Sequence, residues 1–94
     1  MLFSLGKIYI TAGVNFSDKK LYPEISKCIR RHCGGDYGEL DEFDKNENSL
    51  VLEKGFIHGR IFSRYTLSSG DAIYIITTKV DNGYATTIML PSEY

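Results

Sequence analysis

The last third of the chain, residues 60–94, is a run of strand-forming residues with two short breaks, and it limits the possible folds more than any other segment. β-Branched and aromatic residues dominate it, and the breaks fall at Ser68–Asp71 and Asp81–Gly83. The Asn82-Gly83 pair is a strong hairpin signal, because both residue types tolerate the positive φ of a primed turn. The pattern therefore predicts an antiparallel meander with strands near Phe56–Leu67, Ala72–Lys79 and Tyr84–Leu90.

The segment Leu5–Val14 alternates in a way that is typical of a half-buried strand. Ile8, Ile10 and Ala12 fall on one side of it, and Lys7, Tyr9 and Thr11 fall on the other. The polar stretch Asn15–Lys20 should end this strand.

A first helix is expected to begin near Pro23, a residue that suits the first turn. Glu24 lies near the positive end of the helix dipole, whereas Arg30, Arg31 and His32 lie near the negative end. The apolar stripe predicted to face the core contains Ile25, Cys28, Ile29 and His32. Gly34-Gly35 should end the helix through a left-handed cap.

A second helix should begin near Asp41, which can cap it, with Asp44 three residues later in an imperfect capping box. Phe43, Leu50 and Val51 are predicted to form its apolar face, and Gly55 should stop it. The expected order is β-α-α-β-β-β. We therefore predict an α+β fold, with two helices on one face of a largely antiparallel sheet. The sequence leaves open whether the first strand joins the middle or the edge of the sheet.

Composition and length place limits on the class of protein. The 94 residues contain no repeat and no long linker, which predicts one domain over residues 1–94. The net charge of −1 gives no general argument for nucleic acid or for an anionic membrane. No signal peptide or membrane-spanning run is recognised. Cys28 and Cys33 do not form a disulfide framework, and free thiols fit a reducing cytoplasm.

Acidic residues gather between the two predicted helices and at the start of the second. Residues 1–35 are mainly basic, and the following segment carries one lysine against six acids: Asp36, Glu39, Asp41, Glu42, Asp44 and Glu47. The simpler interpretation is that acids near a helix N-terminus favour its dipole and that the others are solvated. The sharper hypothesis is an acidic docking surface that imitates the charge of nucleic acid and binds a basic protein partner. The segment does not match a calcium-binding loop.

Residues with catalytic or metal-binding chemistry are few. Cys28, His32, Cys33 and His58 are the candidates for a soft-metal cluster, and they lack the spacing of a zinc site. Cys33 lacks a suitable base, because its neighbour His32 would point in another direction on the helix. We therefore expect no catalytic residue, no metal and no cofactor.

One strand of the predicted meander offers the alternative site. Arg60, Phe62 and Arg64 alternate along one face, with His58 just before them. Interleaved basic and aromatic side chains can bind single-stranded nucleic acid, although the same pattern is common on the outer face of a sheet.

Three blocks of the sequence resemble a family of small bacterial proteins carried on plasmids, integrated elements and phages. The chain opens with Leu5-Gly6-Lys7-Ile8, like the family's LGxIxxTxG, and closes on Thr86-Thr87 through Pro91, Glu93 and Tyr94, like TTxLxPxEY. The central block, Gly35-Asp36-Tyr37-Gly38-Glu39-Leu40, is similar to GDWGEL. The resemblance covers nearly the whole chain.

This resemblance implies a mobile-element origin rather than a particular activity. Tyr37 stands where the family has tryptophan, which is a tolerable aromatic exchange. The family's E-A-D-R stretch is absent, and the chain has Thr78-Lys79-Val80-Asp81-Asn82-Gly83 there. If that stretch were an active site in the family, this chain would lack it.

Two classes of function follow as hypotheses. The first is a small non-enzymatic interaction protein of a mobile genetic element, for example an inhibitor of a host restriction or CRISPR-type defence system that docks on a protein. The alternative is a small nucleic-acid-binding protein or toxin-like nuclease using Arg60, Arg64 and His58, with Glu53 as a further candidate. A homo-oligomer is a further expectation, since an exposed edge of the meander would offer a route to pairing between copies.

Overall fold

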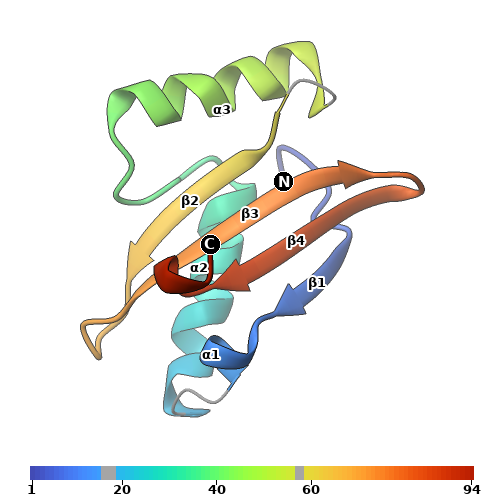
Figure 1. Cartoon of the computed structure of the whole chain (residues 1–94). Coiled ribbons are helices and arrows are strands. Elements are labelled where there is room, and N and C mark those ends of the chain that lie inside the picture. Colours follow the sequence, from blue (N-terminus) through green and yellow to red (C-terminus); the bar gives the residue numbers. More distant parts are fainter. Residues whose placement is uncertain (16–18, 57–58) are drawn as a thin grey trace.

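The computed structural model describes residues 1–15, 19–56 and 59–94 as an α+β fold, which confirms the predicted class. Figure 1 shows a four-stranded sheet, with α2 crossing behind it and α3 lying beside the outer strand β2. The regular elements in chain order are β1 (Lys7–Ile10), α1 (Ala12–Asn15), a 3₁₀ turn (Lys19–Leu21), α2 (Tyr22–Cys33), α3 (Glu42–Lys54), β2 (Ile61–Thr66), β3 (Ala72–Val80), β4 (Gly83–Met89) and a 3₁₀ turn (Pro91–Glu93).

The predicted meander is present. The strands lie in the order β1-β4-β3-β2, and β3 pairs antiparallel with both β2 and β4. β1 joins the edge next to β4 and runs parallel to it, so the sheet is mixed. The first predicted meander strand began at Phe56, whereas β2 begins at Ile61, with residues 57–58 outside the described ranges.

The N-terminal strand is shorter and more exposed than predicted. Residues 7–10 form β1, and the chain turns into the short helix α1 at Ala12. All four residues of β1 are exposed, so the prediction of a half-buried strand was wrong. The physical reason is the position of α2, which packs against β2 and the centre of the sheet and leaves β1 without cover. The polar break predicted over Asn15–Lys20 lies partly outside the described residues.

α2 follows the prediction closely. Pro23 lies in its first turn, and Ile25, Cys28 and His32 are buried against the sheet. The central cluster joins them to the isoleucines of the strands, among them Ile73, Ile75 and Ile88. After the helix, Gly35 takes a φ of +93°, which ends it as expected.

α3 has the predicted bounds but not the predicted apolar face. Asp41 caps it by accepting the N–H of Asp44 at 2.9 Å, and Gly55 follows its last residue. Val51 is buried, whereas Phe43 is 70% exposed and Leu50 is 42% exposed. The helix reaches the core from the margin of the sheet, where Val51 packs in one cluster with Ile61 and Cys33. Because α3 contacts an edge strand rather than a broad sheet face, its buried stripe is narrow. No helix among the described residues is long and apolar enough to cross a membrane.

Candidate functional site

Three of the six predicted docking acids are used inside the fold. Asp36 accepts hydrogen bonds from Arg31, whose Nε lies 2.8 Å from its Oδ2, and from the Gly38 N–H at 3.2 Å. These contacts, with the Arg31 hydrogen bond the largest cause, hold the pKa of the Asp36 carboxyl below its ordinary value. Glu39 is ion-paired with Arg64 at 3.3 Å and accepts the Thr66 hydroxyl at 2.7 Å.

Asp41 is the third, because its carboxylate caps α3. The simpler interpretation of the acidic block, a helix N-terminus with local partners, therefore accounts for Asp36, Glu39 and Asp41.

The other three acids lie on the first two turns of α3. Glu42 approaches Lys45 at 3.9 Å, and its side chain is 86% exposed. Such an exposed pair contributes little to stability. No ion pair joins Asp44 or Glu47 to another described residue. The charge available to a partner is therefore concentrated on this part of α3.

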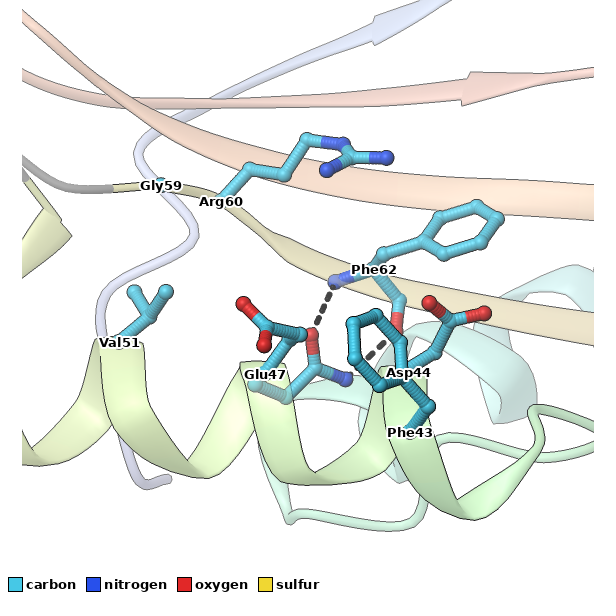
Figure 2. A pocket seen from close by; sticks show the side chains of 8 residues that line it. Phe43, Asp44, Glu47, Val51, Gly59, Arg60 and Phe62 are labelled. Atoms are coloured by element: carbon cyan, nitrogen blue, oxygen red, sulfur yellow. Dashed lines mark hydrogen bonds between the residues drawn. The ribbon is translucent and has the colours of Figure 1, made fainter.

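A groove of about 310 Å³ lies between this part of α3 and the start of β2. Figure 2 shows the side chains around it, with Asp44 and Glu47 projecting from the helix and Arg60 from the chain entering β2. Its lining residues are Phe43, Asp44, Glu47, Asn48, Val51, Gly59, Arg60 and Phe62. The groove thus brings together two of the predicted acids and two residues of the predicted basic face, which the sequence placed in separate sites.

The predicted basic face is formed in part. Phe62 and Arg64 point to the side of the sheet away from α2, since the alternate residues Ile61, Ser63 and Tyr65 are buried. Arg64 is ion-paired with Glu39, so its charge is already partly neutralised. His58 lies outside the described residues.

Arg60 belongs to an aromatic cluster that the sequence did not reveal. Its Nη2 donates to the Tyr94 hydroxyl at 2.7 Å, and its guanidinium lies 5.3 Å from the centre of the Phe62 ring. Phe62 meets Tyr74 edge to face, with ring centres 4.7 Å apart, and Tyr94 lies 5.9 Å from Tyr74. The alternation in β3 could have placed Tyr74 on this face, but no local signal joins the distant Tyr94 to it.

His32 is fully buried, as its place in the predicted core-facing stripe of α2 implies, and both of its ring nitrogens have partners. Nδ1 lies 2.5 Å from the Ser63 hydroxyl, and Nε2 lies 2.9 Å from the Thr77 hydroxyl. Burial lowers the pKa of His32 to about 4. Within the described residues, no group of three His, Cys, Asp or Glu side chains is placed to hold a metal ion. The imidazole is therefore a neutral structural group.

A comparison with protein-family models finds no matching family, and comparisons with curated proteins and with solved structures find no match either. The functional argument therefore rests on the groove and the surfaces next to it.

Proposed function

We propose that this chain is a small non-enzymatic interaction protein that docks on a protein partner through the groove between α3 and β2. The observation that carries the proposal is Phe43, which is 70% exposed at the rim of the groove and is followed directly by Asp44. An exposed aromatic ring beside carboxylates that form no ion pair with a described residue is typical of a binding hot spot in a protein interface. Burial of the ring would supply affinity, and the carboxylates would select the partner's charge.

The partner's chemistry follows from the lining of the groove. Asp44 and Glu47 favour a cationic side chain, and the rings of Phe43 and Phe62 favour a flat one. Arginine meets both requirements, because its guanidinium pairs with carboxylates and stacks on aromatic rings. The partner surface is therefore proposed to present arginine within an apolar patch.

The biological setting is proposed from the family resemblance. The Gly35–Leu40 block and the C-terminal Thr86–Tyr94 block support an origin on a plasmid, phage or integrated element. A mobile element benefits from small proteins that bind and block host machinery. The concrete form of the proposal is an inhibitor of a restriction or CRISPR-type defence system that acts by docking.

The experiment is a pull-down from host lysate with the tagged chain, with and without nuclease, comparing four variants. Phe43→Ala should lose the partner, whereas Leu50→Ala, at an exposed position of the same helix, should retain it. The double charge reversal Asp44→Lys, Glu47→Lys should also lose it, and Glu53→Lys, beyond the groove on α3, should not. Recovery of the partner at the wild-type level with Phe43→Ala and with the double variant would contradict the proposal.

Nucleic-acid binding is the second candidate, and the Phe62, Tyr74 and Tyr94 cluster beside Arg60 favours it. Aromatic rings on an open sheet face can stack with unpaired bases. If this function holds, Arg60→Ala and Phe62→Ala should each weaken binding of a labelled single-stranded oligonucleotide, and Phe43→Ala should not. A nuclease activity that persists in the His58→Ala, Arg60→Ala double variant would exclude these two residues as its catalytic groups.

A further inference from the structure

The two edges of the sheet differ in whether other parts of the chain form hydrogen bonds with their outward backbone groups. At the β2 edge, the side-chain amide of Asn48 makes two hydrogen bonds with the backbone of Phe62, at 2.8 and 3.0 Å. Two residues along, the Arg64 N–H donates to the Tyr37 carbonyl at 3.1 Å, and the Arg64 carbonyl accepts from the Glu39 N–H at 2.8 Å. The other side of the meander is covered by β1. The meander therefore has no exposed edge, contrary to the expectation from sequence.

The exposed edge belongs to β1, beyond which Figure 1 shows no described element. The Thr11 N–H donates to the Ile88 carbonyl at 3.1 Å, so Thr11 directs its backbone groups toward β4. Because these directions alternate along a strand, the backbone N–H and C=O groups of Tyr9 also point toward β4. The N–H and C=O groups of Ile8 and Ile10 point outward. The residues Ile8, Tyr9 and Ile10 are 43%, 49% and 46% exposed. Such an edge is a template for another strand.

We propose that β1 pairs antiparallel with β1 of a second copy of this chain, about a twofold axis at Tyr9. In this register Ile8 of each copy faces Ile10 of the other, and the outward groups of both residues form backbone hydrogen bonds. The four isoleucines then gather on the α2 side of the joined sheet, where each is half exposed in one copy. Tyr9 meets Tyr9 on the opposite side.

The charges at the ends of β1 complement each other in the same register. Lys7 stands opposite Thr11 of the second copy, and Thr11 donates its hydroxyl to Glu93 at 2.6 Å. Side chains that face each other across antiparallel strands are about 5 Å apart, so Lys7 would reach the Glu93 carboxylate of the second copy. Within its own chain, Lys7 makes no ion pair with a described residue. A register shifted by two residues sets Ile10 opposite Gly6 and leaves one isoleucine pair, whereas the register about Tyr9 has two. The larger number of isoleucine pairs selects Tyr9 as the axis.

The test is sedimentation equilibrium of the full chain from about 1 µM to about 500 µM. This concentration range is wide because an interface of two short strands is small and its affinity is expected to be weak. The average mass should rise toward twice the 10.6 kDa of one chain. Tyr9→Lys sets two cations across the axis and should weaken association at least about tenfold. The matched control, Leu50→Lys on α3, is 42% exposed and should leave the association unchanged. A wild-type mass of one chain at every concentration, or association that Tyr9→Lys leaves intact, would overturn the proposal.

Amide hydrogen exchange of the wild-type chain tests the register without a variant. The Ile8 and Ile10 amides should exchange more slowly as the concentration rises. The Tyr9 amide, directed toward β4, should be protected at every concentration. Association without slower exchange at Ile8 and Ile10 would place the interface on another surface and overturn the β1 pairing.

Discussion

The side-chain amide of Asn48 pairs with the backbone of Phe62 in the way that a neighbouring strand would. Its Oδ1 accepts the Phe62 N–H at 3.0 Å, and its Nδ2 donates to the Phe62 carbonyl at 2.8 Å (the dashed lines at Phe62 in Figure 2). Asn48 is 1% exposed, so water cannot easily replace these bonds. A side chain of α3 thereby satisfies the outward backbone N–H and C=O groups of the edge strand β2. The same contact holds α3 against β2 beside the groove that Phe43 lines.

Asn48→Ala should therefore lower the free energy of unfolding by about 2 to 3 kcal/mol, because it leaves a buried donor and a buried acceptor of Phe62 without partners. Urea unfolding measures this change. Asn46→Ala, at an exposed position two residues earlier in α3, is the matched control and should change stability by less than about 0.5 kcal/mol. Equal effects of the two substitutions would show that the Asn48 contact contributes nothing specific.

Gly38 lies where the chain passes very close to β2. Its φ is +74°, and a Cβ added to it would lie 2.1 Å from the carbonyl oxygen of Arg64. Gly70 has a similar φ of +90° but no atom within 4 Å of an added Cβ. Gly70→Ala should cost only the left-handed backbone penalty of about 1 to 2 kcal/mol. Gly38→Ala should cost clearly more in the same unfolding experiment, since it also separates the Tyr37–Glu39 backbone from Arg64. A smaller loss for Gly38→Ala than for Gly70→Ala would contradict this account.

The six acids between Asp36 and Glu47 should separate into a group used inside the fold and a group on the surface. Glu39→Lys removes the ion pair with Arg64 and sets two cations together, so it should destabilise the fold by about 1 kcal/mol. Glu47→Lys should change the unfolding free energy by less than about 0.5 kcal/mol, because no ion pair joins Glu47 to a described residue. Thermal unfolding of the two variants beside the wild type measures the difference, and a larger loss for Glu47→Lys would contradict the assignment.

Local patterns were enough to predict much of the fold. The Asn82-Gly83 turn, the alternation in the strands and the Asp41 cap each rest on interactions within a few residues. The burial of α3 was not predictable in this way. Phe43 has an apolar side chain at helical spacing, but whether it is buried depends on which strand the helix meets, and α3 meets only an edge.

The candidate site was predicted as two separate surfaces because its halves are distant in sequence. Asp44 and Glu47 belong to α3, whereas Arg60 and Phe62 lie after the end of that helix. The fold brings the two halves together where Asn48 binds the β2 edge. The ion pair between Glu39 and Arg64 is likewise a product of tertiary structure. Charge patterns along the chain indicate that such residues exist, but only the folded chain decides which of them neutralise each other.

The hydrogen bonds around His32 determine its tautomer. Thr86 donates its only hydroxyl proton to the Leu5 carbonyl at 2.7 Å, so Thr77 must donate to Thr86 in the 2.7 Å bond between their hydroxyls. Thr77 then has no proton left for His32, and the His32 Nε2 must donate to Thr77. Ser63 donates to Nδ1 of the neutral ring. Long-range ¹⁵N–¹H spectra at neutral pH should show the Nε2–H tautomer, and a proton on Nδ1 would contradict this chain of bonds.

The buried neutral ring also makes stability depend on pH. The pKa of His32 is about 4 in the folded chain and about 6.5 when exposed, so between these values the unfolded chain binds a proton that the folded chain does not. Stability from this group is therefore complete above pH about 6.5 and is lost as the pH falls toward 4. The expected loss between pH 7 and pH 5 is about 2 kcal/mol.

Urea unfolding at a series of pH values measures this loss. The pKa values of the Glu24, Asp36 and Glu93 carboxyls are lowered by hydrogen bonds, from Ser68, Arg31 and Thr11 respectively, so their contributions to stability are lost at lower pH than this range. His32→Gln should flatten the slope between pH 7 and pH 5, whatever its effect on absolute stability. If His32→Gln left the slope as it is in the wild type, the proton that destabilises the fold would bind to a group other than His32.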